Sequence, residues 1–230
     1  YGINPVIEAL RAGRVKELRV GDRADGRIAE LVKAAAHEGI TIRRVTSADL
    51  DRAVGGGARR RHQGVVAELE APTDVGIGDL VAGAKGAPLL VVLDGIEDPH
   101  NVGAILRTVD AAGADGVVRQ SRRAAALGGA VAKASAGAVS HVQIAEVVNI
   151  ARALEELKEA GVWTVGLAGD VEKTYDEVDL TLPTALVLGA EGSGLRRLVR
   201  ERCDWVVSIP LRGHVQSLNV SVAAGIALFE

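Results

Sequence analysis

The stretch of residues 89–112 reads LLVVLDGIEDPHNVGAILRTVDAA. It begins with a continuous apolar run, Leu89–Leu93, which is typical of a β-strand buried on both faces of a parallel sheet. From Asn101 to Ala112 apolar residues recur at helical spacing, and Gly113 follows as a stop signal. The stretch therefore predicts a strand, a polar loop and a helix whose N-cap is Asn101.

The same alternation of strand and helix patterns continues to residue 230. Further strands are predicted at Gly116–Val118, Val139–Ile144, Val162–Leu167, Ala185–Leu188 and Trp205–Ile209, and helices at Ala124–Ala134, Ile150–Ala160, Gly194–Arg202 and Leu218–Phe229. Alternation of this kind favours an α/β fold, with a mostly parallel sheet covered by helices on both faces. We assign residues 88–230 to this domain.

Residues 1–70 predict a second, smaller α/β domain. Asn4 and Pro5 open a short helix, helical spacing returns at Arg27–Glu38, and strand patterns lie between and after these segments. Glycine and proline then accumulate with little periodicity in residues 71–87, which predicts a linker. The expected organisation is a small N-terminal domain, a linker and a larger C-terminal domain.

The composition excludes several classes of protein. One cysteine in 230 residues leaves no internal disulfide framework and no cysteine-based zinc site, and 2% aromatic residues argue against a binder built on rows of stacking rings. No apolar stretch approaches the ~18 residues of a membrane span, and no signal-peptide pattern begins the chain, which predicts a cytoplasmic protein without a membrane partner. The absence of methionine predicts that the chain begins inside a longer one.

Charge is unevenly distributed along the chain. Residues 1–70 carry 13 Lys and Arg against 10 Asp and Glu, whereas the remaining residues carry 14 against 20. A basic front part indicates an anionic partner, and chance surface composition is the alternative explanation.

Two loops after predicted strands are unusual, and ligands of open parallel sheets bind at the carboxyl ends of strands. The first, Asp94–Gly103, leads into the helix that carries Arg107, which lies off the apolar stripe and is free to reach an anion. The second is LGAEGSGL at residues 188–195, whose glycines permit a close backbone approach or positive φ around Glu191.

A third loop follows the strand that ends at Ile209 and leads to the last helix. Ser217 is the expected N-cap of this helix, and Asn219 lies exposed in its first turn. Taken one at a time, the three loops also have plain structural interpretations, as helix caps, a tight turn and a solvated arginine. The glycine-rich loop matches neither the dinucleotide fingerprint nor a phosphate-binding loop.

Together, the three loops carry a specific combination of motifs. The segments NVGAILRT, LGAEGSGL and SIPL…SLNVSVAAG resemble, in order and spacing, the three motifs of the SpoU/TrmH branch of the SPOUT RNA methyltransferases. The N-terminal segments YGINPVIEAL and RHQGVVA are similar to the substrate-binding domain of the subgroup that 2′-O-methylates a guanosine of the large-subunit, or 23S, ribosomal RNA.

The resemblance implies an enzyme that transfers a methyl group from S-adenosylmethionine to a ribose 2′-hydroxyl of ribosomal RNA. It further implies a homodimer and a catalytic domain with a trefoil knot. The site residues that it implies are Arg107, Asn101, Glu191, Ser217 and Asn219 for catalysis, and Gly189, Ile209 and Leu218, through backbone groups, for the cofactor. This transfer needs no metal, and His62, His100 and His214 form no metal-binding pattern.

Arg107 is the residue that the family pattern places at the reacting ribose. A guanidinium has a pKa above about 12 and does not lose its proton in proteins. We therefore expect Arg107 to hold a phosphate beside the ribose and to stabilise the developing alkoxide, rather than to act as the base.

The N-terminal domain is expected to supply affinity for RNA. Its densest basic run consists of Arg59, Arg60, Arg61 and His62, which follow three glycines. We expect these four side chains to contact RNA, and a solvated loop is the alternative.

Two functions of other classes stay open at this point. One is an RNA-binding assembly factor without catalysis, against which the presence of all five catalytic residues argues. The other is a doubly wound enzyme with a nucleotide cofactor, against which the missing phosphate-binding fingerprints argue. Within the methyltransferase class, transfer RNA or a ribosomal site that confers antibiotic resistance are the alternative targets.

Overall fold

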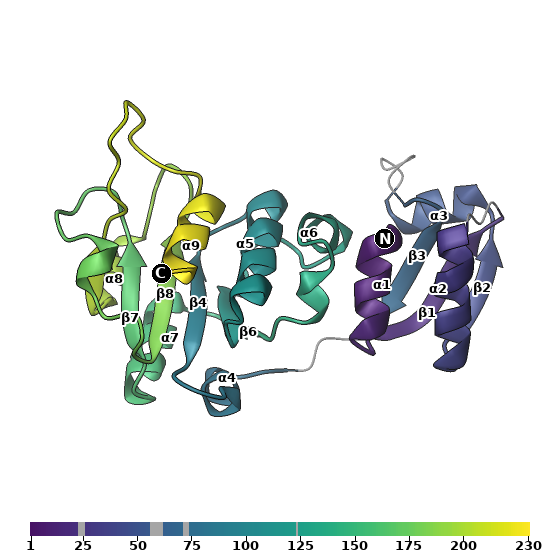
Figure 1. Ribbon diagram of the computed structural model, residues 1–230, viewed down its shortest axis with the longest axis horizontal. Coiled ribbons are helices and arrows are strands. Elements are labelled where there is room, and N and C mark those ends of the chain that lie inside the picture. Colours follow the sequence, from purple (N-terminus) through teal and green to yellow (C-terminus); the bar gives the residue numbers. More distant parts are fainter. Residues whose placement is uncertain (23–25, 56–61, 71–73, 123) are drawn as a thin grey trace. The chain divides into compact units, whose positions relative to one another are not determined.

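The protein forms two compact units in the computed structural model, which describes residues 1–22, 26–55, 62–70, 74–122 and 124–230 (Figure 1). The small unit consists of Tyr1–Thr73 together with Leu127–His141. The large unit consists of Asp74–Ala126 and Val142–Glu230. The chain therefore leaves the large unit and returns to it, rather than crossing from one unit to the other once.

The small unit is built on a three-stranded sheet in the order β2-β1-β3. Strand β1 (Val15–Gly21) pairs in parallel with β2 (Thr41–Val45) and antiparallel with β3 (Val65–Leu69). The helices of this unit are α1 (Ile3–Arg11), α2 (Gly26–His37), α3 (Ser47–Ala53), α6 (Gly129–Ala134) and the 3-10 turn η1 (Ala138–Ser140). Apolar side chains of α1, α2 and the sheet form one core, as the alternating pattern of residues 1–70 predicts.

Gln63 fixes the beginning of α1. It adopts a positive φ of 52°, and its side-chain oxygen accepts a hydrogen bond of 3.0 Å from the backbone N–H of Ile3. The first N–H groups of a helix have no partner within the helix, so this bond satisfies one of them from a residue 60 positions away.

The large unit is built on a six-stranded sheet in the order β6-β5-β4-β8-β7-β9. Its strands are β4 (Leu89–Asp94), β5 (Gly116–Gln120), β6 (Ile144–Val147), β7 (Trp163–Leu167), β8 (Thr184–Gly189) and β9 (Trp205–Val207). Every pairing between neighbouring strands is parallel. The predicted mostly parallel sheet is thus confirmed, and all carboxyl ends of its strands meet at one edge.

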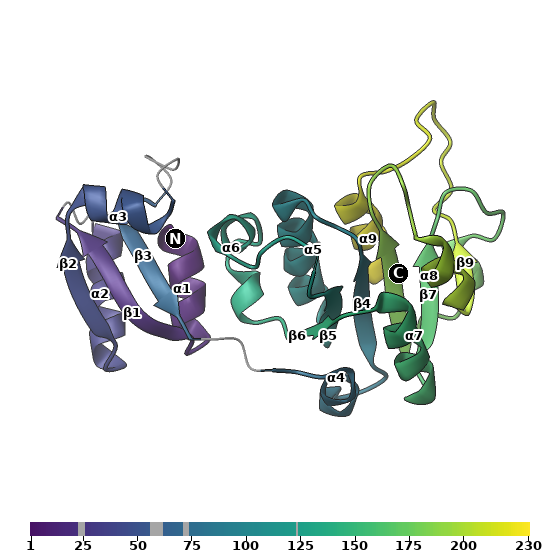
Figure 2. The same cartoon turned by 180° about the vertical axis from the view of Figure 1, so that it is seen from behind.

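Helices cover both faces of this sheet (Figures 1 and 2). They are α4 (Ile77–Gly83), α5 (Pro99–Ala112), α7 (Ile150–Glu159), α8 (Arg197–Arg202) and α9 (Val220–Leu228), together with the 3-10 turn η2 (Tyr175–Glu177). On one face α7 packs with β4, β5 and β8 in one core, and on the other α9 contacts both α5 and β8.

Several segments differ from the expectation. Residues 71–87, expected to be a linker, contain α4, whose Ile77 and Leu80 belong to the core of the large unit. The side chain of Asp79 accepts a hydrogen bond of 2.8 Å from the backbone N–H of Gly76 and so begins this short helix. A helix of seven residues is too short to show a helical period, which is why the sequence pattern missed it.

The strand predicted at Val139–Ile144 is wrong. The first part of this run forms η1, because Gly137 adopts a φ of 100° and its carbonyl accepts a hydrogen bond of 2.9 Å from the N–H of Ser140. The strand of this region is β6, which begins at Ile144. The helices predicted at Ala124–Ala134 and Gly194–Arg202 are shorter, since α6 begins at Gly129 and α8 at Arg197.

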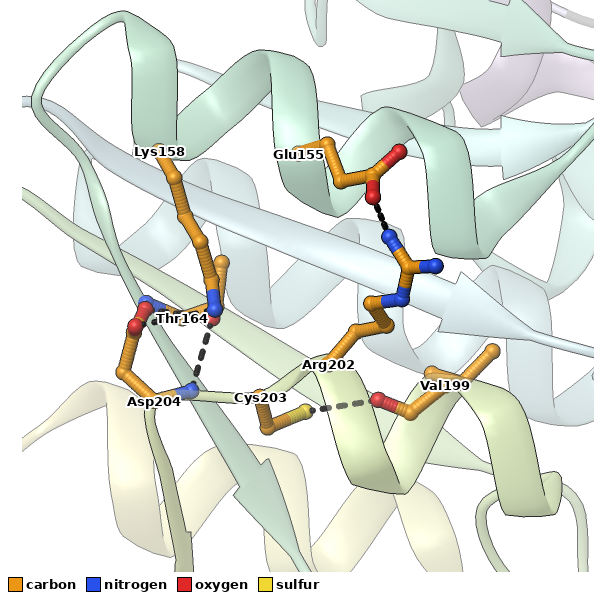
Figure 3. A network of polar contacts seen from close by, with 7 residues as sticks. All are labelled: Glu155, Lys158, Thr164, Val199, Arg202, Cys203 and Asp204. Atoms are coloured by element: carbon orange, nitrogen blue, oxygen red, sulfur yellow. Dashed lines mark hydrogen bonds and ion pairs between the residues drawn. The ribbon is translucent and has the colours of Figure 1, made fainter.

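A network of polar contacts joins the beginning of β7 to the beginning of β9 (Figure 3). One carboxylate oxygen of Asp204 accepts hydrogen bonds from the backbone N–H and the hydroxyl of Thr164, at 2.9 and 2.7 Å. Lys158 of α7 lies 2.9 Å from the other oxygen, and Arg202 of α8 pairs with Glu155 of α7. The network fixes the edge strand β9 and both helices beside it.

Cys203 lies in the same network and is unreactive by position. Burial raises the pKa of its thiol to about 12, and its Sγ lies 3.3 Å from the carbonyl oxygen of Val199. Because the fold favours the neutral thiol, this group contributes its full stability below about pH 9, and stability falls as the pH rises from about 9 towards 12.

We expect iodoacetamide at pH 8 to alkylate native Cys203 about 1,000-fold more slowly than the urea-unfolded chain, because the thiolate population falls tenfold for each unit of pKa. The single cysteine makes mass spectrometry of the intact chain a direct readout. Equal rates in the two states would show that the thiol is accessible and ionises normally.

Candidate active site

Three of the five expected catalytic residues form a hydrogen-bonded cluster at the carboxyl edge of the large sheet. The side-chain amide of Asn219 donates to the side-chain oxygen of Asn101 at 2.9 Å and to a carboxylate oxygen of Glu191 at 2.6 Å. Asn101 is buried in α5, whereas Glu191 lies exposed in the loop after β8. The fold therefore joins all three motif segments through one amide group, which we call the Asn219 cluster.

The same Asn219 is the N-cap of α9. Its side-chain oxygen accepts hydrogen bonds from the backbone N–H groups of Ser221 and Val222 at 2.9 and 3.4 Å. The expectation that Ser217 caps this helix is therefore wrong, since Ser217 lies two residues earlier. It is exposed and makes no hydrogen bond within the part of the chain that is described. Asparagine and serine are equally good caps, so the sequence alone could not choose between the two positions.

Asn101 is not the N-cap of α5, as the sequence pattern predicted. Asp98 caps the helix by accepting a hydrogen bond of 3.0 Å from the N–H of His100, and Pro99 occupies the first turn. Proline is favoured there because its missing N–H would have had no partner. Asn101 thus lies inside the helix, and its buried side chain is available to Asn219 rather than to the backbone.

Arg107 lies on α5 with its side chain exposed, as its position off the apolar stripe predicts. Within the described residues its side chain forms no hydrogen bond and no ion pair, and the structure does not join it to the Asn219 cluster. Its guanidinium, with all of its donors unused, can therefore bind an anion that reaches this edge of the sheet.

Sequence reasoning missed an ion pair that holds the neighbouring loop. Asp94, fully buried at the end of β4, accepts hydrogen bonds from the backbone N–H and the Nε of Arg196 at 2.8 and 2.6 Å. Arg196 is the N-cap residue of α8, 102 positions later. The sequence did contain a signal for this pair, since Asp94 directly follows five apolar strand residues. A carboxylate in such a place is buried, and a buried charge requires a partner.

The glycine-rich loop folds back on itself. A Cβ at Gly189 would lie 2.2 Å from the backbone carbon of Gly194, so only glycine fits there. Gly192 and Gly194 adopt positive φ values of 80° and 65°. The sequence suggested that these glycines permit a close backbone approach or a positive φ, and both are present. The close approach, however, is between two parts of the loop itself.

The other expected cofactor residues lie at the same edge of the sheet. Ile209 follows β9, and Leu218 precedes the N-cap of α9; both are half-buried. Residues 209–218 belong to no helix or strand, and their backbone groups form no hydrogen bond with other described residues. These N–H and C=O groups are therefore available to a ligand, which fits a molecule held by backbone groups.

The expected RNA-binding run is only partly described. Arg59, Arg60 and Arg61 lie outside the described residues. His62 is buried, its Nδ1 accepts a hydrogen bond of 3.0 Å from the N–H of Gly64, and its Nε2 lies 3.4 Å from a carboxylate oxygen of Asp51. The prediction that His62 faces RNA is thus corrected: this ring fixes the chain just before β3.

The described part of the chain holds neither a candidate metal site nor a candidate membrane span. Among the described residues, no three or more His, Cys, Asp or Glu side chains are grouped so that they could hold a metal ion. No described helix has the length and apolar character needed to cross a membrane.

Comparison with known protein families gives two matches that together cover nearly the whole chain. Residues 88–229 match the SpoU rRNA methylase family, and residues 1–75 match the RNA 2′-O ribose methyltransferase substrate-binding family. The chain is 47% identical to the 23S rRNA (guanosine-2′-O-)-methyltransferase RlmB of Ralstonia nicotianae, over 91% of this chain and 83% of the relative. It is 43% identical to the putative TrmH family tRNA/rRNA methyltransferase YacO of Bacillus subtilis, over 100% and 92%.

Solved structures of the same fold include the SpoU methyltransferase AviRb of Streptomyces viridochromogenes. Its structure in complex with the cofactor AdoMet matches with a TM-score of 0.82 at 26% identity, over 99% of this chain and 86% of that one. An rRNA methyltransferase of Sinorhizobium meliloti matches with a TM-score of 0.79 at 26% identity, over 99% and 83%. The motifs, the parallel α/β fold and these matches agree, and the chain belongs to the SpoU rRNA methylase family.

Proposed function

We propose that this protein transfers the methyl group of S-adenosylmethionine to the ribose 2′-hydroxyl of a guanosine in 23S ribosomal RNA. The observation that carries the proposal is the Asn219 cluster, which joins one residue from each of the three motif segments. The proposal takes its substrate from relatives named as 23S rRNA (guanosine-2′-O-)-methyltransferases, which are 42–48% identical to this chain.

S-adenosylmethionine, when bound, supplies an activated methyl group. The backbone of Gly189, Ile209 and Leu218 would hold it, since the groups of residues 209–218 are free to bind a ligand. The protein must then hold the 2′-oxygen in line with that methyl carbon.

Arg107 is proposed to bind the phosphate beside the target ribose and to stabilise the alkoxide as the hydroxyl loses its proton. Glu191 and Asn101, held together by Asn219, orient the ribose and Arg107, while Ser217 and Asn219 shape the pocket. Asn219 also fixes the distance between α5 and the glycine-rich loop, because its amide donates a hydrogen bond to each of them.

Mapping of 2′-O-methylation on total RNA, with and without the protein, tests the proposal. A single guanosine of 23S ribosomal RNA is expected to gain the modification only in the presence of active protein. Modification of transfer RNA would show the other target, and binding of ribosomal RNA without any methylation would show an assembly factor.

We further propose that the active form is a homodimer that works in the cytoplasm, where ribosomal RNA is its substrate. Exposed apolar side chains at the end of the chain support the dimer: Val222 and Phe229 are 51% and 66% exposed. These two residues are seven positions apart, so they lie on one side of α9 and its C-cap, and an exposed apolar patch is typical of a protein–protein contact. Sedimentation of the protein at micromolar concentration should give twice the mass of one chain.

We propose an RNA-binding domain at residues 1–70 and a methyltransferase domain at residues 88–230. Residues 71–87, expected to be a linker between them, contain α4, which packs in the core of the large unit. Replacing Arg59, Arg60 and Arg61 together with glutamine is expected to weaken RNA binding and to lower the slope of log affinity against log salt by about 2, because each phosphate contact releases a counterion. Filter binding at four salt concentrations measures both quantities.

The matched control is Arg44→Gln, which removes an exposed arginine of β2 in the same unit. This variant should keep the affinity and slope of the natural chain. If the triple variant also keeps both, RNA binds elsewhere on the protein.

A further inference from the structure

Both tryptophans of the chain line one cavity of the large unit. Their ring centroids are 5.4 Å apart, and the cavity beside them has a volume of about 290 Å³. Trp163 is 47% exposed, although large aromatic side chains are usually covered. The remaining lining residues are Val165, Lys173, Glu177, Val178, Asp179, Leu182 and Thr184. We call this site the indole pocket.

The strand register explains why the indole pocket is open. Trp163 and Val165 lie on the same face of β7, and Val165 pairs with Trp205 of β9. The intervening Thr164 pairs with Ala185, which belongs to the core packed against α7. The indoles therefore lie on the opposite face of the sheet. On that face α9 contacts β8, whereas the segment from Lys173 to Leu182 lies over β7 and β9.

The indole pocket lies away from the Asn219 cluster. Trp163 and Trp205 are the first residues of β7 and β9, and Thr184 is the first residue of β8. The Asn219 cluster follows the last residue of β8. In a parallel sheet these are opposite edges, so the proposed methyl transfer makes no use of the indole pocket.

The two indoles are held in place before any ligand binds. Thr164 follows Trp163 and Asp204 precedes Trp205, and three hydrogen bonds of 2.7–3.0 Å join Thr164 to Asp204 (Figure 3). Lys173 Nζ lies 4.9 Å from the ring centroid of Trp205, which shows that this ring already accepts a cation. A preformed aromatic surface lowers the entropy lost on binding.

The rim of the indole pocket is acidic. Residues 170–179 contain five acidic side chains and one basic one, in the more acidic part of the chain. Glu177 and Asp179 each use a single oxygen to accept hydrogen bonds, from Thr174 and Thr181, which leaves the other oxygen of each carboxylate for a partner. These hydrogen bonds lower the pKa of both groups, so both are ionised at neutral pH.

This charge excludes RNA as the natural occupant, because its phosphates would be repelled, and favours a cation. Arginine and lysine side chains bind well over a tryptophan face, and a nearby carboxylate adds a charge-assisted hydrogen bond. We propose that the indole pocket binds an arginine or lysine side chain of a basic polypeptide segment, with its cation over Trp163 and facing Glu177 and Asp179.

The test uses the fluorescence of the full chain, because both tryptophans lie in the site and no other residue type emits in that range. The probe is a blocked hexa-arginine peptide, with a hexa-serine peptide and a ten-nucleotide single-stranded RNA as comparisons. Hexa-arginine is expected to change the tryptophan emission in a saturable way, and the other two are not.

Two variants assign the contacts. The first is Glu177→Gln with Asp179→Asn, which keeps the acceptor oxygens for Thr174 and Thr181 but removes two charges; about tenfold weaker binding is expected. The second, Trp163→Ala, should weaken binding about tenfold when followed by calorimetry. Methylation of purified ribosomal RNA should be unchanged in both, which separates this site from the proposed function.

The matched control is Glu156→Gln with Glu159→Gln, two exposed acids of α7 on the other face of the sheet. It should leave the affinity for hexa-arginine unchanged. If the control weakens binding as much as the Glu177 and Asp179 variant, the peptide binds through net charge alone and the proposal is wrong. A saturable response to RNA that Trp163→Ala removes would equally overturn it.

Discussion

Replacing Asn219 with alanine is expected to slow single-turnover methyl transfer by about 100- to 1,000-fold. The amide nitrogen of Asn219 joins Asn101 of α5 to Glu191 of the glycine-rich loop. Removing a preorganised hydrogen-bond donor from an active site costs roughly this factor in other enzymes. The side-chain oxygen also caps α9, so a loss of about 1 kcal/mol of stability is expected as well.

Asn219→Asp separates the two roles. Aspartate keeps an oxygen that can accept from the N–H groups of Ser221 and Val222, but it cannot donate, and its charge repels Glu191. We expect this variant to retain the helix cap and still lose activity as severely as Asn219→Ala. Labelled S-adenosylmethionine measures the rate, and thermal unfolding measures stability. An aspartate variant with natural activity would show that the bridging amide plays no part in the reaction.

Arg107→Lys is expected to lower the single-turnover rate about 100-fold while leaving the affinity for S-adenosylmethionine unchanged. Lysine keeps the positive charge but loses the planar pair of donors that holds a phosphate at two oxygens. Arg107 is exposed, and its side chain forms no hydrogen bond or ion pair with the described residues, so stability should change by less than about 0.5 kcal/mol.

Arg197→Lys provides the matched control. Arg197 is an exposed arginine of α8 that, among the described residues, pairs with Glu201 of the same helix, and its replacement should leave the rate unchanged. If Arg107→Lys also retains a near-natural rate, neither a bidentate phosphate contact nor an arginine base describes the reaction. Rapid quench of enzyme preloaded with the methyl donor gives the rate without interference from product release.

The large sheet could be predicted because its strands are buried on both faces. Leu89–Leu93 and Ala185–Leu188 are continuous apolar runs, and β4 and β8 lie where these runs predict them. Short elements could not be predicted, because one or two turns show no period. Ile77 and Leu80 of α4 are core residues because apolar side chains of the large unit pack against them.

The site could be predicted as a set of residues but not as a geometry. The motif resemblance named Asn101, Glu191 and Asn219. The local capping patterns, however, wrongly made Asn101 the N-cap of α5 and Ser217 the N-cap of α9. Capping preference is a local quantity, whereas the partner of Asn219 lies 118 positions away in the sequence. Asp94 and Arg196 were missed for the same reason, since neither residue type is unusual until the fold brings them together.

The doubled role of Asn219 has a consequence for motion. One side chain, Asn219, both caps α9 and connects Asn101 to Glu191. Fraying of the first turn of α9 would therefore separate all three residues of the Asn219 cluster at once. Amide hydrogen exchange at Ser221 and Val222 should therefore report how often the enzyme is competent, without any substrate present. Molecules that bind nowhere near the ribose could then alter turnover simply by loosening or tightening the end of the chain.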